Sequence, residues 1–173
     1  MKKLITIIIA ICVAGVIFYG GYTVAQKQVQ NKQMVYGDKT AQFIHKTPSD
    51  TLASMTKYKP GIYYYGFPTC PWCLELLPVF DSVLKQQGKK AYVVNTRADN
   101  YTSADNILLE KFFVNHTDKK RLTVPFIVVI KNNKATMTHI GTVSGHNATE
   151  SRMTDGQKKE LTKKLRQLVK EAQ

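Results

Sequence analysis

The stretch YYYGFPTCPWCLELLPVF, from Tyr63 to Phe80, carries two of the three cysteines of the chain. Cys70 and Cys73 lie at the junction between a short β-branched and aromatic run, Ile62 to Tyr65, and a series of apolar residues spaced as on a helix. Such a pair can serve as a redox couple, as half of a metal site or as a structural disulfide. Residues around the pair, and elsewhere in the chain, discriminate among these three interpretations.

The position of the pair at a predicted helix start favours redox chemistry. If Pro71 is the first helical residue, the sulfur of Cys70 lies over the helix N-terminus. Free N–H groups and the positive end of the helix dipole stabilise a thiolate there. Cys73, one turn further on, is then shielded beneath it. We therefore predict Cys70 as the attacking nucleophile and Cys73 as the resolving thiol.

The two other interpretations have less support in the sequence. A permanent disulfide between residues this close closes almost no loop and stabilises little. Structural zinc requires four ligands, but the sequence has no second cysteine pair. The histidines show no ligand-like spacing: they are His45, His116, His139 and His146. We expect no cofactor and no metal site, although two thiolates suffice for copper(I), so a copper-binding metallochaperone is the alternative function.

Pro78 links the pair to a known pattern. It falls five residues after Cys73, inside the apolar stripe, where a proline costs about 3 kcal/mol. A C-x-x-C pair at the start of a helix that is kinked by such a proline resembles the thioredoxin-fold superfamily. Thr123-Val124-Pro125 resembles the second signature of that fold, a cis-proline loop beside the active-site disulfide. The resemblance covers roughly residues 47 to 170, and it implies an α/β fold with a central mixed sheet flanked by helices.

The resemblance also implies which residues form the site. It makes the Cys70-Cys73 pair a redox-active disulfide. The neighbours that it implies as shaping the site are Pro71, Trp72, Val124 and Pro125.

One position departs from the family pattern. Six residues before the first cysteine, where thioredoxins have an aspartate that moves protons, this chain has Tyr64. A tyrosine is a poor base at neutral pH. We therefore expect the proton of the buried cysteine to move through water or through Glu75.

The N-terminus predicts a membrane anchor. Lys2 and Lys3 precede an uncharged segment of 22 residues, Leu4 to Ala25, which is long enough to span a bilayer and includes Cys12. The basic flank places the N-terminus in the cytoplasm and the rest of the chain outside it. The expected organisation is a membrane anchor or cleaved signal segment at 1–25, a linker at 26–39 and a thioredoxin-like domain at 40–173.

The charge and the topology restrict the partners. The net charge is +13, with basic residues scattered along the chain, which indicates attraction to anionic lipid or cell wall rather than nucleic-acid binding. The whole arrangement resembles the membrane-anchored, extracytoplasmic thiol-disulfide oxidoreductases of Gram-positive bacteria, including accessory proteins of bacteriocin clusters. That resemblance implies two kinds of partner: exported polypeptides that carry thiols or disulfides, and a membrane redox protein.

The remaining elements follow from periodicity and capping residues. We predict strands at Ala41 to His45, Ile62 to Tyr65, Ala91 to Val94, Pro125 to Ile130 and Ala135 to Ile140. Helices are expected to begin near Thr47, Cys70, Thr102 and Thr154. In the helix after Thr102 we expect to find buried Ala104, Ile107, Leu108 and Phe112. In the last helix we expect to find buried Leu161, Leu165, Leu168 and Val169.

Overall fold

The computed structural model describes residues 34 to 172. The predicted membrane segment, with Cys12, and most of the predicted linker lie outside the described residues. Within residues 34 to 172, no helix has both the length and the apolar character that a membrane crossing requires.

The centre of the fold is a mixed sheet of five strands in the order β1-β3-β2-β4-β5. The strands are β1 (Phe43–Ile44), β2 (Gly61–Gly66), β3 (Ala91–Asn95), β4 (Phe126–Lys131) and β5 (Lys134–Ile140). β3 is parallel to β1 and to β2, whereas β4 is antiparallel to β2 and to β5. The five strands occur where the sequence predicts them, and β4 is buried over its continuous apolar run.

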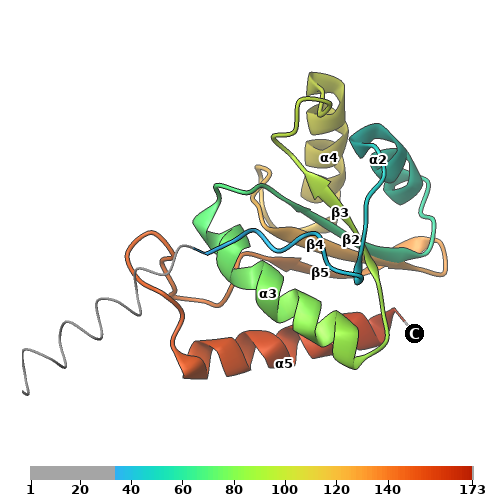
Figure 1. Cartoon of the computed structure of the whole chain (residues 1–173). Helices are drawn as coiled ribbons and strands as arrows, with labels where there is room; N and C mark the ends of the chain where they lie inside the picture. The colour runs from blue at the N-terminus through green and yellow to red at the C-terminus, as the bar shows by residue number, and fades with distance from the viewer. Residues whose placement is uncertain (1–33, 173) are drawn as a thin grey trace, which may run out of the picture. The chain divides into compact units, whose positions relative to one another are not determined.

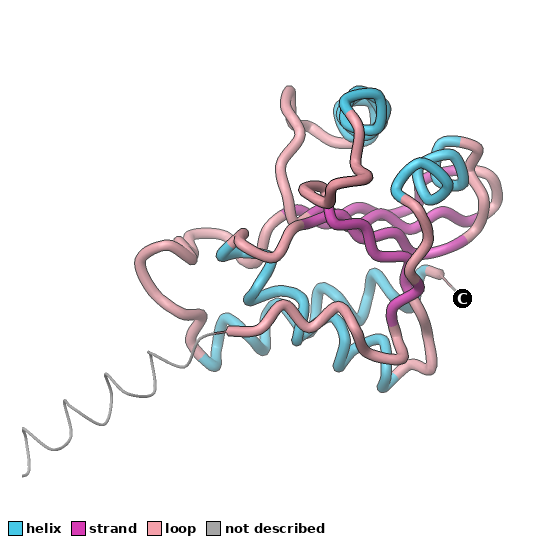
Figure 2. The backbone as a smooth tube through the Cα atoms, turned by 45° about the horizontal axis from the view of Figure 1, so that its top comes forward, coloured by secondary structure: helices cyan, strands magenta, loops and turns pink. Residues whose placement is uncertain are grey.

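Two helices cover each face of the sheet (Figure 1). The helices are α2 (Pro48–Thr56), α3 (Pro71–Gln86), α4 (Ser103–His116) and α5 (Asp155–Glu171). α2 packs beside α4 on one face and α3 beside α5 on the other, and Figure 2 shows the sheet between these two layers. The predicted capping boxes at Thr102 and Thr154 are both present. This mixed sheet with flanking helices is the arrangement that the resemblance implies.

Each layer has its own hydrophobic core. The α3/α5 core includes Leu76, Phe80, Val83, Leu84, Leu161, Leu165, Leu168 and Val169. The α2/α4 core includes Leu52, Met55, Leu109, Phe112 and Phe113. Side chains alternate between the two faces along a strand. The middle tyrosine of β2, Tyr64, therefore enters the α3/α5 core, whereas Tyr63 and Tyr65 enter the α2/α4 core.

The buried face of α4 differs from the prediction. Phe112 is buried as expected, but Ala104, Ile107 and Leu108 are exposed. Asp105 is buried instead, and its carboxylate accepts hydrogen bonds from Thr102 and from Ser49 of α2. Those bonds fix the rotation of the helix, so that the buried apolar residues are Leu109, Phe112 and Phe113.

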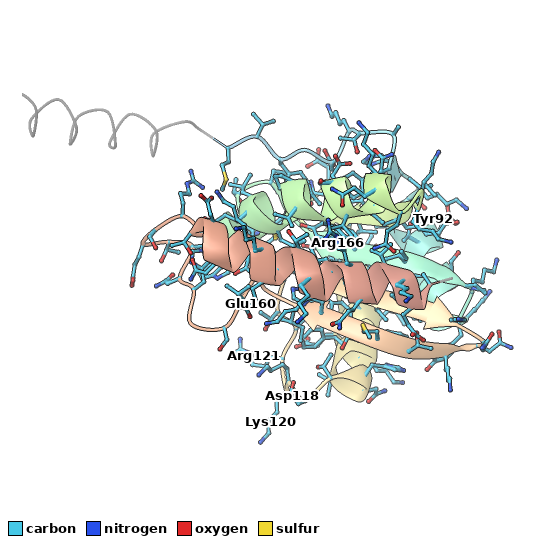
Figure 3. The ribbon with its side chains drawn as sticks, turned by 90° about the horizontal axis from the view of Figure 1, so that it is seen from below. Tyr92, Asp118, Lys120, Arg121, Glu160 and Arg166 are labelled. Atoms are coloured by element: carbon cyan, nitrogen blue, oxygen red, sulfur yellow. The ribbon has the colours of Figure 1, made fainter. Side chains whose placement is uncertain are left out.

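The N-terminal segment, residues 35 to 42, packs on the rest of the domain. It runs beside α3 in Figure 1, and the Thr40 hydroxyl donates a hydrogen bond to Asp81 of that helix. Tyr36, which falls within the predicted linker, packs against the α3/α5 core. On the same side, Arg166 of α5, which is labelled in Figure 3, donates a hydrogen bond to Gln86 at the end of α3.

Candidate functional site

Cys70 and Cys73 lie together at the start of α3, and both are free thiols. Cys70 is the N-cap, and its Sγ accepts a hydrogen bond of 3.3 Å from the backbone N–H of Cys73. Pro71 is the first helical residue and has no N–H to leave unsatisfied. Cys70 is 4% exposed and Cys73 is 0% exposed, so the second thiol is the more shielded.

The surroundings of Cys70 favour its thiolate. A hydrogen bond from the Cys73 thiol is the largest effect, and it outweighs the opposing effect of burial. Backbone N–H groups of Cys73 and Trp72 and the positive charge of Arg97 act in the same direction. Together they lower the pKa of Cys70 to about 7, so a large fraction of this sulfur is thiolate at neutral pH.

Arg97 is a site residue that the sequence analysis missed. Its guanidinium lies 3.6 Å from the centroid of the Phe67 ring, and Nη1 lies 3.4 Å from the Thr69 hydroxyl oxygen. The carboxyl ends of neighbouring parallel strands meet at one edge of a sheet, and Gly66 pairs with Asn95 here. A basic residue just after β3 therefore comes close to the residues after β2. A sequence prediction that paired β2 with β3 would have placed Arg97 near Cys70.

Cys73 has the opposite electrostatic character. Its hydrogen bond to Cys70 and its burial raise its pKa far above the ordinary value for a thiol. The backbone N–H of Phe67 and the Tyr64 hydroxyl lower its pKa, but by less. The two pKa values are displaced in opposite directions. Cys70 is therefore suited to act as the nucleophile, and Cys73 stays protonated as the resolving thiol.

Gly66 allows the close packing around Cys73. A Cβ atom at this position would lie 2.9 Å from Cys73 Sγ and would also overlap the Tyr64 hydroxyl. No larger residue fits there without moving one of these two groups. The structure thus places Tyr64 directly beside the buried cysteine.

The cis-proline loop at Val124-Pro125 lies beside the cysteine pair. The Val124-Pro125 peptide bond is cis, as the resemblance implies. The Cys70 sulfur lies 3.9 Å from the Val124 carbonyl oxygen, although the two residues are 54 positions apart in the sequence. Pro125 is buried and leads directly into β4.

Glu75 has other partners than the cysteines. Its Oε2 lies 2.8 Å from Nε2 of His146 and accepts a hydrogen bond of 3.1 Å from the Met153 N–H. The nearest guanidinium nitrogen of Arg152 is 4.0 Å from Oε1. The carboxylate therefore connects α3 to the loop between β5 and α5. Sequence reasoning missed His146 and Arg152 because more than 70 positions separate them from Glu75.

Trp72 lines a groove of about 1070 Å³. Its other walls are β5, the outer strand of the sheet, the loop from Gly141 to Ser144, and residues of α5 including Gln167. The end of α4 and the residues after it, from Asn115 to Lys119, also line the groove, and Figure 3 labels Asp118 among them. The groove is open to solvent, and Trp72, which lies between the two cysteines in the sequence, is its lining residue from α3.

Comparisons with known proteins find similarity among solved structures alone. No family model matches the sequence, and no curated protein is similar to it. Among solved structures, the chain is similar to thioredoxin O2 from Arabidopsis thaliana in the oxidized state, with 15% sequence identity and a TM-score of 0.44. The match covers 64% of this chain and 88% of the other. What the site can do is therefore argued from its own geometry.

Proposed function

We propose that the protein is a thiol-disulfide oxidoreductase that acts outside the cytoplasm on exported polypeptides. The observation that carries this proposal is the pairing of Cys70, a capping thiol whose pKa is lowered to about 7, with the fully buried Cys73. A permanent structural disulfide has no need of a stabilised thiolate. A thiol that must attack and leave repeatedly does.

In the oxidising direction, a substrate thiolate attacks the sulfur of Cys70 in the Cys70-Cys73 disulfide. A bond forms between the substrate and Cys70, and the Cys70-Cys73 bond breaks with its electron pair on Cys73, which then takes a proton. A second substrate thiolate attacks the substrate sulfur of this mixed disulfide and releases Cys70 as a thiolate. The substrate loses two electrons and the pair gains them, and in the reducing direction each step runs backwards.

An extended polypeptide is the substrate form that the surroundings favour. The Val124 carbonyl lies beside Cys70 at the cis-proline loop, where it can accept a backbone hydrogen bond from an extended chain. The groove beside Trp72 leaves room for the flanking residues of such a chain. Trp72 would then contact the substrate next to the reacting sulfur.

The proposed location rests on the first 25 residues. A basic start followed by 22 uncharged residues suits a single membrane anchor with the domain outside the cytoplasm. Without Lys2 and Lys3 the rest of the chain has 23 basic and 12 acidic residues, and this net charge of +11 would hold the domain near anionic lipid or cell wall. A membrane redox protein would then reset the pair after each turnover.

The first experiment is the reduction potential of the pair in the full chain with Cys12→Ser, so that only Cys70 and Cys73 are counted. The protein is equilibrated with glutathione buffers and its free thiols are trapped at each point. A value near −120 mV would indicate a donor of disulfides, and one near −270 mV a reductant, by analogy with the potentials of strong oxidases and thioredoxins.

The same preparation tests the alternatives. A pair that does not exchange with glutathione or with a disulfide peptide would overturn the proposal. Stoichiometric copper(I) binding by the reduced chain, without such exchange, would instead favour the copper-binding function. The variant Cys70→Ser is the control, because it leaves only the buried thiol.

A further inference from the structure

Two buried tyrosine hydroxyls lie beside Cys73 without a hydrogen-bond partner. Tyr64 is 0% exposed, and within residues 34 to 172 neither its hydroxyl nor that of Tyr36 has a partner at good geometry. A buried hydroxyl left in this way costs about 1 to 3 kcal/mol. Phenylalanine would fill the same space without that cost, so the two hydroxyls call for an explanation.

The two hydroxyls and the Cys73 sulfur occupy one small space. A Cβ atom on Gly66 would overlap the Tyr64 hydroxyl and would lie 2.9 Å from the sulfur, so both groups pack against the same side of Gly66. Tyr36 reaches this place from the N-terminal segment, and its hydroxyl is close enough to that of Tyr64 for each to shift the pKa of the other. Three separate segments of the chain thus meet here: the N-terminal segment, β2 and α3.

Both hydroxyls keep their protons. Burial is the main cause that raises the pKa of Tyr36 and of Tyr64 well above the ordinary value. A hydroxyl that stays protonated can donate a hydrogen bond to a neighbouring thiolate, and its hydrogen rotates freely between acceptors. Tyr64 acts on Cys73 in this sense, because it lowers the pKa that burial and Cys70 raise.

Among residues 34 to 172, the groups with the largest effect on Cys73 include no side-chain cation. Cys70 and Tyr64 act on it directly, Tyr36 lies close to Tyr64, and Asp38 acts on Tyr36. The positive charge of Arg97 acts on Cys70. Apart from the Phe67 N–H, the described surroundings therefore offer a Cys73 thiolate only the Tyr64 hydroxyl as a donor outside the pair.

We infer that Tyr64, oriented by Tyr36, donates a hydrogen bond to the sulfur of Cys73 as that sulfur becomes a thiolate, and thereby controls the step that resolves the mixed disulfide. This inference rests on the proposed function. In the resolving step the Cys73 thiol loses its proton to solvent and its thiolate attacks the Cys70 sulfur. The Cys70-Cys73 bond forms, the bond from Cys70 to the substrate breaks, and the electron pair leaves on the substrate sulfur, which takes a proton.

In this step both tyrosines are positioning residues. Tyr64 supplies no electrons and no net proton: its hydroxyl hydrogen turns toward the Cys73 sulfur. The Tyr36 hydroxyl can then donate to the Tyr64 oxygen, which strengthens the bond to the thiolate. The N-terminal segment thereby contributes to the chemistry of a site 34 residues further along the chain.

The test uses Tyr64→Phe and Tyr36→Phe in the full chain with Cys12→Ser. Cys70 is first linked to a coloured aromatic thiol, and the release of that thiol by Cys73 is timed as a function of pH. We expect Tyr64→Phe to slow release at neutral pH by about tenfold or more, the factor expected for one hydrogen bond to a charged group. The midpoint of the pH profile for release of the aromatic thiol should move to higher pH. Tyr36→Phe should shift the profile in the same direction by less.

The matched control is Tyr65→Phe, the next residue on β2. Its hydroxyl lies 3.1 Å from Met55 Sδ on the opposite face of the sheet, so its loss should leave the pH profile of release unchanged. An unchanged profile in Tyr64→Phe would overturn the inference, while continued exchange would leave the proposed function intact. If Tyr64→Phe does not fold, the half-buried Tyr36 supports the same test, and an unchanged profile in Tyr36→Phe overturns the inference.

Discussion

The tyrosine hydroxyls on the two faces of the sheet differ in whether they have a hydrogen-bond partner. On the α2/α4 side, the Tyr63 hydroxyl donates to the Lys59 carbonyl and the Tyr65 hydroxyl lies against Met55 Sδ. On the α3/α5 side, the hydroxyls of Tyr36 and Tyr64 have no partner of good geometry within the described chain. The unpaired tyrosine hydroxyls therefore lie on the same side of the sheet as the thiols. The tyrosine hydroxyls on the α2/α4 side thus contribute to stability. Those on the α3/α5 side remain free to donate a hydrogen bond to a sulfur that changes its charge.

The largest effect is expected from removing the nucleophile on the α3/α5 side. Cys70→Ser should abolish disulfide exchange, because Cys73 is fully buried and its raised pKa keeps it protonated. The measurement is the rate of exchange with a disulfide peptide. Cys73→Ser should instead leave Cys70 reactive and trap the mixed disulfide, which mass spectrometry of the protein would detect. Equal residual activity in the two variants would contradict the assigned roles.

Gly66→Ala tests the close packing on the α3/α5 side. The added methyl overlaps the Tyr64 hydroxyl and approaches Cys73 Sγ, so we expect a loss of about 1 to 3 kcal/mol in the free energy of unfolding. Urea unfolding measures this loss. Gly88→Ala is a control for changing a glycine away from the site, because nothing lies near its Cβ position, although its positive φ adds some strain. Unchanged stability in Gly66→Ala would mean that the space beside Cys73 is larger than the structure indicates.

The pH dependence of Cys70 gives a smaller and more specific effect. Alkylation requires the thiolate, so its rate should rise as the pH passes through about 7 and level off above it. Arg97→Ala removes a nearby positive charge and should move that midpoint to higher pH, by a fraction of a unit because the guanidinium is exposed. A pH series with iodoacetamide measures the shift, and Arg121→Ala in the loop before Val124 is the matched control. A midpoint unmoved by Arg97→Ala would exclude the electrostatic role.

The smallest effect belongs to the α2/α4 side. Tyr63→Phe removes one hydrogen bond to the Lys59 carbonyl and should cost about 1 kcal/mol in the free energy of unfolding. It should leave the alkylation profile of Cys70 unchanged, because Tyr63 faces away from the thiols. Urea unfolding and the same iodoacetamide series measure the two quantities. A change in the reactivity of Cys70 would show that the two faces are coupled.

Local patterns in the sequence predicted most of the fold. The capping boxes at Thr102 and Thr154 act within four residues, and the stripe from Leu161 to Val169 repeats along one helix. The cis bond before Pro125 was implied by the resemblance and is present, although nothing in the local residues requires it. The capping boxes and the apolar stripe depend on short stretches of chain, which is why the sequence alone predicts them.

Contacts between distant segments could not be predicted. The exposed face of α4 follows from a hydrogen bond between Ser49 and Asp105, which are 56 positions apart. Arg97 reaches Cys70 because β2 and β3 are parallel neighbours, which periodicity alone does not specify. Tyr36 was assigned to a polar linker, and its role depends on packing against β2 and α3.

The position of Tyr36 has a consequence for how the domain could be released from an anchor. A protease that cuts before residue 34 would free a domain with its site complete. A cut after Gly37 would free a chain that retains both cysteines but lacks one of the two hydroxyls beside Cys73. The shed and the anchored forms would then differ in redox behaviour, although every residue of the C-P-W-C motif is the same in both.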